Sequence, residues 1–101
     1  MTWIDAADAS LPDESVVAVQ VDGTSIALAK VDGAWHAVET WCTHAECPLS
    51  DGWIEAAAIR CTCHGSLFDL ATGDVVEGPA VEPVRIFPTR VTGDRVEIEA
   101  P

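Results

Sequence analysis

Residues 15–39 read SVVAVQVDGTSIALAKVDGAWHAVE, and this stretch indicates the fold class. It holds three runs of β-type residues, separated by the dipeptides Asp22-Gly23 and Asp32-Gly33. Asp-Gly between such runs is among the stronger short-range signals for a hairpin, because a tight hairpin turn needs residues that tolerate positive φ. The stretch therefore predicts consecutive antiparallel strands at 15–21, 24–31 and 34–39.

The C-terminal part of the chain repeats this pattern once. The segments VRIFPTRV (84–91) and RVEIEA (95–100) flank the turn residues Thr92-Gly93-Asp94. Pro88 cannot donate a ladder hydrogen bond, so part of the first strand is expected at a sheet edge or a bulge. No stretch has a convincing 3.6-residue period. We therefore predict an all-β fold in which residues 1–101 form a single domain.

The charge of the chain is strongly acidic. Seventeen Asp and Glu residues against five Lys and Arg give a net charge of −12, which disfavours nucleic acid and anionic membranes as partners. Residues 1–15 lack the features of a secretory signal, and no apolar run approaches the roughly 18 residues of a membrane span. We expect a soluble, cytoplasmic monomer whose charge suits fast docking to a basic protein partner, or serves solubility alone.

Cysteine and histidine concentrate in the middle of the chain. All four cysteines and two of the three histidines lie within residues 42–64. The two groups are Cys42-Thr43-His44 with Cys47, and Cys61-Thr62-Cys63-His64. Two such tight clusters argue against buried thiols with incidental histidines, and in a cytosolic protein they indicate metal or redox chemistry.

Two kinds of metal site fit these residue types. Structural zinc takes four Cys or His ligands, commonly in C-x₂₋₄-C or H-x₃₋₅-H pairs, and it would have to choose four of the six side chains here. Alternatively, C-x-H followed by C-x-x-H offers one thiolate and one imidazole from each loop. That arrangement suits a two-iron cluster whose two ends differ. The spacing leaves both alternatives open.

The two motifs resemble the cluster-binding loops of Rieske [2Fe–2S] proteins, in which two histidines replace two cysteines on one iron. CTH at 42–44 and CTCHGSLFD at 61–69 carry the resemblance, and TGDVVEGPAVEPV at 72–84 is similar to the segment that covers the cluster. The resemblance implies a three-sheet antiparallel β fold. A small loop-rich cluster-binding subdomain would occupy about 41–83, and a basal β subdomain the remainder. It also implies one cluster per chain, with Cys42 and Cys61 on one iron and His44 and His64 on the other.

The resemblance extends to residues around the cluster. Ser66 and Phe68 match a serine and a tyrosine that donate hydrogen bonds to cluster sulfurs in quinol-oxidising Rieske subunits. Because phenylalanine cannot donate, we predict a midpoint potential in the lower half of the range of roughly −150 to +300 mV. Cys47 and Cys63 match a disulfide of the same subunits. Disulfides are uncommon in the cytosol, so two reduced thiols are the alternative.

Other side chains of the region are expected near the cluster. Trp41, Trp53 and Leu67 would shield it, or would serve ordinary core packing. The outward ring nitrogens of His44 and His64 would be the port through which electrons enter and leave. Four further residues are expected at its rim: Ala45, Glu46, Gly65 and Pro79.

The resemblance implies an electron carrier rather than an enzyme. A free-standing Rieske ferredoxin of an aromatic-ring-hydroxylating dioxygenase system would pass single electrons from a flavin-containing NAD(P)H reductase to the terminal oxygenase. A chain of 101 residues leaves no room for the catalytic domain of an oxygenase. The alternative is a Rieske-like accessory subunit, or an interaction module that binds zinc.

Overall fold

The computed structural model describes residues 2–41, 47–63 and 65–99, and within these ranges the protein consists of antiparallel sheets. Its elements are β1 (Trp3–Asp8), β2 (Ser15–Val21), β3 (Thr24–Val31), β4 (Ala34–Glu39), the 3₁₀ turn η1 (Leu49–Asp51), β5 (Trp53–Glu55), β6 (Ala58–Arg60), β7 (Leu67–Asp69), β8 (Val75–Glu77), β9 (Ile86–Phe87), β10 (Thr89–Thr92) and β11 (Arg95–Glu99). The described part contains no α-helix, and none of its elements is a helix long and apolar enough to span a membrane. The all-β prediction is confirmed.

The middle sheet has the strand order β2-β3-β4-β9, and the predicted hairpins form its first three strands. At both turns the aspartate and the glycine have positive φ, 53° and 81° at Asp22 and Gly23, and 50° and 79° at Asp32 and Gly33. Tight hairpin turns of this kind match the right-handed twist of the flanking strands. Local turn chemistry therefore sets the register of this sheet.

Both faces of β3 are buried. Ile26 and Leu28 belong to one apolar cluster, whereas Ala27, Ala29 and Val31 belong to another. Successive side chains of a strand point to opposite faces, so the middle sheet lies between two cores. This explains why the middle of β3, IALA at 26–29, is a continuous apolar run instead of an alternation with polar residues.

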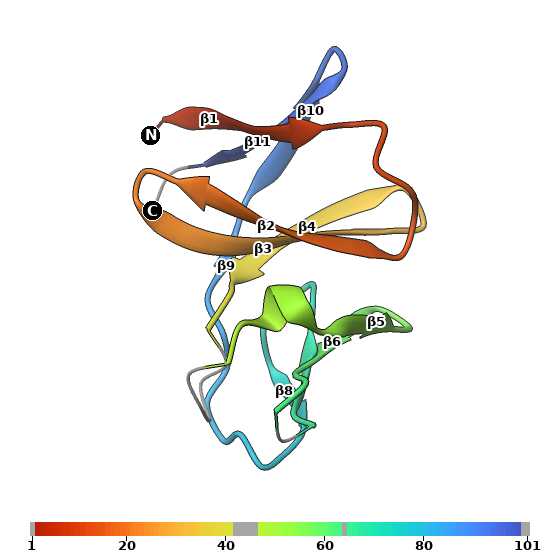
Figure 1. Cartoon of the computed structure of the whole chain (residues 1–101), viewed down its shortest axis with the longest axis vertical. Coiled ribbons are helices and arrows are strands. Elements are labelled where there is room, and N and C mark those ends of the chain that lie inside the picture. The colour runs from red at the N-terminus through yellow and green to blue at the C-terminus, as the bar shows by residue number, and fades with distance from the viewer. Residues whose placement is uncertain (1, 42–46, 64, 100–101) are drawn as a thin grey trace.

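The outer sheet has the order β1-β11-β10 and packs against one face of the middle sheet (Figure 1). The predicted hairpin at 92–94 joins β10 and β11. The single strand expected at 84–91 is wrong: Pro88 divides it into β9 of the middle sheet and β10 of the outer sheet. Strand β1, which the sequence did not predict, pairs with β11 at the far end of the chain.

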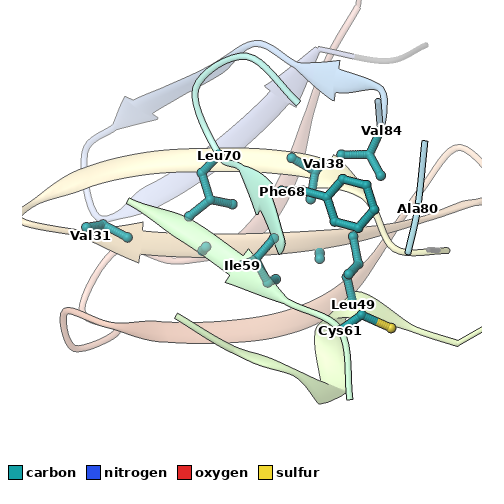
Figure 2. Close-up of a cluster of buried hydrophobic side chains, with 11 residues drawn as sticks. Val31, Val38, Leu49, Ile59, Cys61, Phe68, Leu70, Ala80 and Val84 are labelled. Carbon is teal, nitrogen blue, oxygen red and sulfur yellow. The ribbon is translucent and has the colours of Figure 1, made fainter. Parts of the chain in front are cut away.

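The small sheet, of order β5-β6-β7-β8, lies at the opposite end of the molecule from the outer sheet (Figure 1). A buried apolar cluster joins it to the other face of the middle sheet, as Figure 2 shows for Val31, Val38, Ile59, Phe68 and Leu70. Its strands lie within residues 53–77, inside the segment predicted as a cluster-binding subdomain. The division into two subdomains itself stays a prediction.

Candidate metal centre

Of the four predicted ligands, Cys61 lies in the described part of the chain, and Cys42, His44 and His64 lie outside it. Cys61 follows β6 directly and is 1% exposed. In Figure 2 its sulfur lies at the edge of the apolar cluster and points away from Ile59. Its backbone N–H donates to the carbonyl oxygen of Ser66 at 2.8 Å. This hydrogen bond closes the second loop, residues 61–66, at its base.

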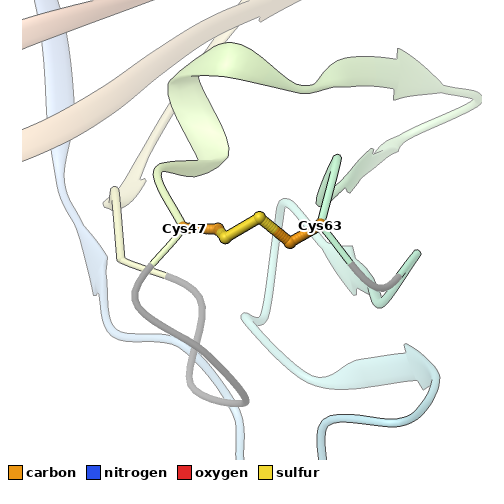
Figure 3. Close-up of a disulfide and its surroundings, with 2 residues drawn as sticks. All are labelled: Cys47 and Cys63. Carbon is orange, nitrogen blue, oxygen red and sulfur yellow. A yellow bond between two sulfur atoms is a disulfide. The ribbon is translucent and has the colours of Figure 1, made fainter.

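A disulfide between Cys47 and Cys63 joins the two segments that carry the predicted ligands (Figure 3). The two Cα atoms are 6.2 Å apart, an ordinary separation for a disulfide. Cys47 comes three residues after His44 in the sequence, and Cys63 directly precedes His64. The disulfide therefore places the exit of the first loop beside the second loop.

Backbone and hydroxyl contacts close the first loop at its base. Trp41 and Pro48 form an isolated β-bridge, and the Leu49 N–H donates to the carbonyl oxygen of Thr40. The Thr40 hydroxyl, which is buried, donates to Ser50 Oγ at 3.1 Å and accepts from the Ser50 N–H at 3.3 Å. These contacts hold Thr40 and Trp41 beside Pro48, Leu49 and Ser50.

Gly52 brings the end of η1 against β6. A Cβ atom on Gly52 would lie 1.9 Å from the carbonyl oxygen of Arg60, so a larger residue would force the two backbones apart. Because η1 follows the first loop and Arg60 precedes the second, this contact also holds the bases of the two loops together.

A third segment reaches the second loop after β8. Its Gly78-Pro79 peptide bond is cis, and the Ala80 N–H donates to the Ser66 hydroxyl oxygen at 3.0 Å. Ser66 is fully buried, and this contact uses its oxygen as the acceptor. A hydroxyl group can donate as well as accept, so Ser66 has the chemistry to donate to an acceptor beside the loop.

Phe68 and Pro79 lie in different environments. Phe68 is fully buried in the apolar cluster that joins the small sheet to the middle sheet. Pro79 is exposed, as expected of a rim residue, and Gly65 is half-buried. The other two expected rim residues, Ala45 and Glu46, lie outside the described part of the chain.

Core packing is the wrong interpretation for two of the three apolar residues near the loops. Trp41 is 51% exposed and Trp53 is 49% exposed, whereas Leu67 is buried. The Trp53 indole N–H donates to Glu55 at 2.7 Å, and a polar partner of this kind suits a tryptophan at the surface. A shielding role for these three residues stays a prediction.

The sequence did not single out an ion-pair cluster beside the second loop. The Arg60 guanidinium donates to the Glu55 carboxylate at 2.5 and 2.9 Å, to the Gly65 carbonyl oxygen at 2.6 Å, and to Glu77 at 3.4 Å. Hydrogen bonds from Arg60 and Trp53 lower the pKa of Glu55, and those to Glu55 raise the pKa of Arg60. One signal was visible: Arg60 is the only Lys or Arg between Lys30 and Arg85.

The donor set fits the expected group. The disulfide uses two of the six clustered Cys and His residues, and two cysteines and two histidines remain. Two thiolates and two imidazoles alone would suit either zinc or a two-iron cluster. In a cluster, Ser66 could donate a hydrogen bond to a sulfur, an interaction that tunes the potential.

Comparisons with known proteins agree with this arrangement. The family described as Rieske [2Fe-2S] domain matches residues 2–88. The ferredoxin component of a naphthalene 1,2-dioxygenase system from Pseudomonas aeruginosa is 36% identical over 98 residues, which cover 96% of this chain and 94% of that protein.

Solved structures of dioxygenase ferredoxins are also similar to this chain. The ferredoxin of carbazole 1,9a-dioxygenase from Nocardioides aromaticivorans has a TM-score of 0.95 at 28% identity, with 100% of both chains covered. A structure described as a complex of reduced oxygenase and oxidised ferredoxin in carbazole 1,9a-dioxygenase has a TM-score of 0.90 at 26% identity. The match covers 95% of this chain and 100% of that one. The three-sheet prediction is confirmed by this similarity.

Proposed function

The chain belongs to the Rieske [2Fe–2S] domain family, and we propose that it is a ferredoxin that delivers single electrons to the terminal oxygenase of an aromatic-ring-hydroxylating dioxygenase system. It is an electron-transfer component and not itself an enzyme, in keeping with relatives named as ferredoxin components. The match covers 94% of the naphthalene dioxygenase ferredoxin component and 100% of the carbazole dioxygenase ferredoxin.

One [2Fe–2S] cluster per chain supplies one-electron redox chemistry when it is bound. The chain would hold it with Cys42 and Cys61 on one iron and with His44 and His64 on the other. Two neutral imidazoles in place of two thiolates make the bound group less negative by two charges, so that accepting an electron costs less. Ser66 would donate a hydrogen bond to a cluster sulfur, and the Ala80 N–H holds its hydroxyl oxygen in place.

The observation that carries the proposal is the joining of two closed loops at one end of the molecule. Each loop is closed at its base by hydrogen bonds, and the Cys47–Cys63 disulfide links them. Ligands from both loops must lie close together to share one cluster, and this arrangement provides that proximity. Whether the disulfide is oxidised in the cell belongs to the proposal.

The acidic surface suits the carrier role. A net charge of −12 attracts a basic surface and so raises the rate of encounter with it. This attraction weakens as added salt screens the charges. A carrier must dock quickly, release, and dock again, and electrostatic steering serves the association rate more than the final affinity. The proposal also includes a flavin-containing NAD(P)H reductase as the electron donor, a monomeric state and a cytoplasmic location.

The proposal is tested by purifying the protein and measuring iron, sulfide and zinc. We expect two irons and two sulfides per chain, a red-brown colour, and an electron paramagnetic resonance signal on reduction. His44→Ala should abolish the signal, and His36→Ala is the matched control because His36 lies in β4 of the middle sheet. One zinc per chain without colour would instead favour the interaction module.

The partner is tested by stopped-flow mixing. Chemically reduced protein should be reoxidised by the oxygenase component of a naphthalene dioxygenase system, and the rate should fall as salt is added. An iron-loaded protein that transfers no electrons to any such oxygenase would contradict the dioxygenase assignment and leave the family assignment intact.

A further inference from the structure

Arg60 is the only cationic residue of the ligand-bearing segment, and its position at the end of β6 places it next to Cys61. Its side chain is 20% exposed and lies among partners on three different segments. Glu55 is on β5, Glu77 is at the end of β8, and Gly65 is in the second loop. The sequence has no other Lys or Arg between residues 31 and 84, so no other basic side chain of this range could take its place.

The contact with Gly65 concerns the loop directly. Gly65 follows His64 and has a φ of 78°, a left-handed conformation that other residues rarely adopt. Its carbonyl oxygen accepts from Arg60 Nη1 at 2.6 Å, while the neighbouring Ser66 carbonyl accepts from the Cys61 N–H. The carbonyls of the two residues that follow the predicted histidine ligand are thus both fixed by hydrogen bonds.

The contact with Glu55 has a different effect. Arg60 Nε and Nη2 face the two carboxylate oxygens of Glu55, the paired geometry for which the planar guanidinium is suited. The carboxylate cancels the charge that Arg60 brings to the loop. The guanidinium can therefore hold the loop without leaving an uncompensated cation beside it.

We propose that Arg60 is a positioning residue for the cluster, which fixes the second ligand loop through the Gly65 carbonyl while Glu55 neutralises its charge. The inference rests on the proposed function, because it concerns a loop that carries Cys61 and His64 as ligands. It separates two tasks of one side chain: the hydrogen bond to Gly65 retains the cluster, and the balance between Arg60 and Glu55 sets part of its potential.

The test compares the midpoint potential and the rate of cluster loss in mild denaturant for four variants of the full chain. Arg60→Gln removes both the charge and the donor to Gly65. Glu55→Gln leaves Arg60 charged and in reach of Gly65. Arg60→Lys keeps the charge but lacks the fork needed to serve both partners. Arg95→Gln is the matched control, since Arg95 pairs with both oxygens of Asp5 at 2.8 Å in the outer sheet.

We expect Arg60→Gln to lower the midpoint potential and Glu55→Gln to raise it, because the first removes a positive charge from beside the loop and the second removes a negative charge. Arg60→Lys should keep a midpoint potential near that of the wild type. Both Arg60 variants should lose the cluster about tenfold faster, the effect of one lost charge-assisted hydrogen bond. Glu55→Gln and Arg95→Gln should lose it at the wild-type rate.

Three results would overturn the inference. The first is an Arg60→Gln protein that matches Arg95→Gln in both measurements. The second is a shift of the midpoint in the same direction for Arg60→Gln and Glu55→Gln, which would indicate general disruption. The third is a wild-type protein that shows no one-electron [2Fe–2S] signal, and this result alone would also overturn the proposed function.

Discussion

The two ends of the molecule are stabilised in different ways. At the outer sheet, a tight hairpin turn and a buried apolar cluster join β1, β10 and β11 to the longer strands β2–β4. At the small sheet the strands are only three residues long. There a disulfide, a buried hydroxyl and an ion-pair cluster supplement the apolar packing. The loops predicted to carry ligands are not strands and have no β-ladder hydrogen bonds to stabilise them. The difference indicates that specific cross-links at their bases hold them instead.

The largest effect is expected from matched core substitutions at the two ends. Leu28 and Leu70 are each 1% exposed, but Leu28 belongs to the cluster under the outer sheet and Leu70 to the cluster under the small sheet. Leu28→Ala and Leu70→Ala should each reduce the free energy of unfolding by about 2–5 kcal/mol in urea titrations. Only Leu70→Ala should also speed cluster loss. Equal rates of cluster loss in both variants would contradict the comparison.

The disulfide should contribute a comparable but smaller amount. Cys47 and Cys63 are separated by 16 residues, and closing a loop of this length stabilises by about 3 kcal/mol in the chain-entropy model. The double variant Cys47→Ser with Cys63→Ser should lose about this much free energy of unfolding.

Mass spectrometry after alkylation gives the matching chemical test. The native wild-type protein should take up no label on Cys47 or Cys63 until it is reduced. Two freely alkylated thiols in the intact protein would refute the disulfide.

A buried hydroxyl should have an effect of about 1 kcal/mol on the reduction equilibrium. Ser66→Ala would remove the predicted donor to the cluster and should lower the midpoint potential by about 40 mV, the value of one hydrogen bond for a one-electron couple. Thr40→Val is the control, because the Thr40 hydroxyl also accepts a backbone N–H at a loop base. Thr40→Val should destabilise the protein and leave the potential unchanged.

A wild-type midpoint potential above about +150 mV would contradict the prediction that it lies in the lower half of the Rieske range.

The smallest effect is expected at an exposed ion pair of the outer sheet. The hydrogen bond from Arg95 lowers the pKa of Asp5 in the folded protein. A carboxyl group of this kind stabilises the fold above its unfolded pKa, and the contribution is lost as the pH falls through the lower folded value. Asp5→Asn and Arg95→Gln should therefore make the acid dependence of the urea midpoint slightly shallower below about pH 4.

A double-mutant cycle checks this assignment. The two substitutions should not add, because each removes the same pair. Additive effects would show that Asp5 and Arg95 act independently.

The sequence predicted the parts of the fold that local chemistry determines. Asp22-Gly23 and Asp32-Gly33 specify their turns without help from distant residues, and the strands they join have the predicted bounds. Strand β1 escaped prediction because its only described ladder partner is β11, about ninety residues away. The strand expected at 84–91 failed because Pro88 changes which sheet the chain joins, and that choice depends on the rest of the fold.

The candidate site also has a part that the sequence predicted and a part that it did not. The resemblance of two short motifs predicted the four ligands, which stay a prediction, and the pairing of Cys47 with Cys63, which is present in the structure. The cluster of Arg60 with Glu55 and Gly65 could not be predicted in this way. It requires the β5–β6 register, which sets Trp53 opposite Arg60, together with a loop that turns its carbonyl toward the guanidinium.

The most direct test of the central claim is pulsed electron paramagnetic resonance of the reduced protein, which detects magnetic nuclei bound to the cluster. Two imidazole ligands predict hyperfine couplings from two nitrogen nuclei in the wild-type protein, and His36→Ala should leave both in place. A reduced cluster without coupled nitrogen, as four thiolate ligands would give, would contradict the ligand set of Cys42, His44, Cys61 and His64.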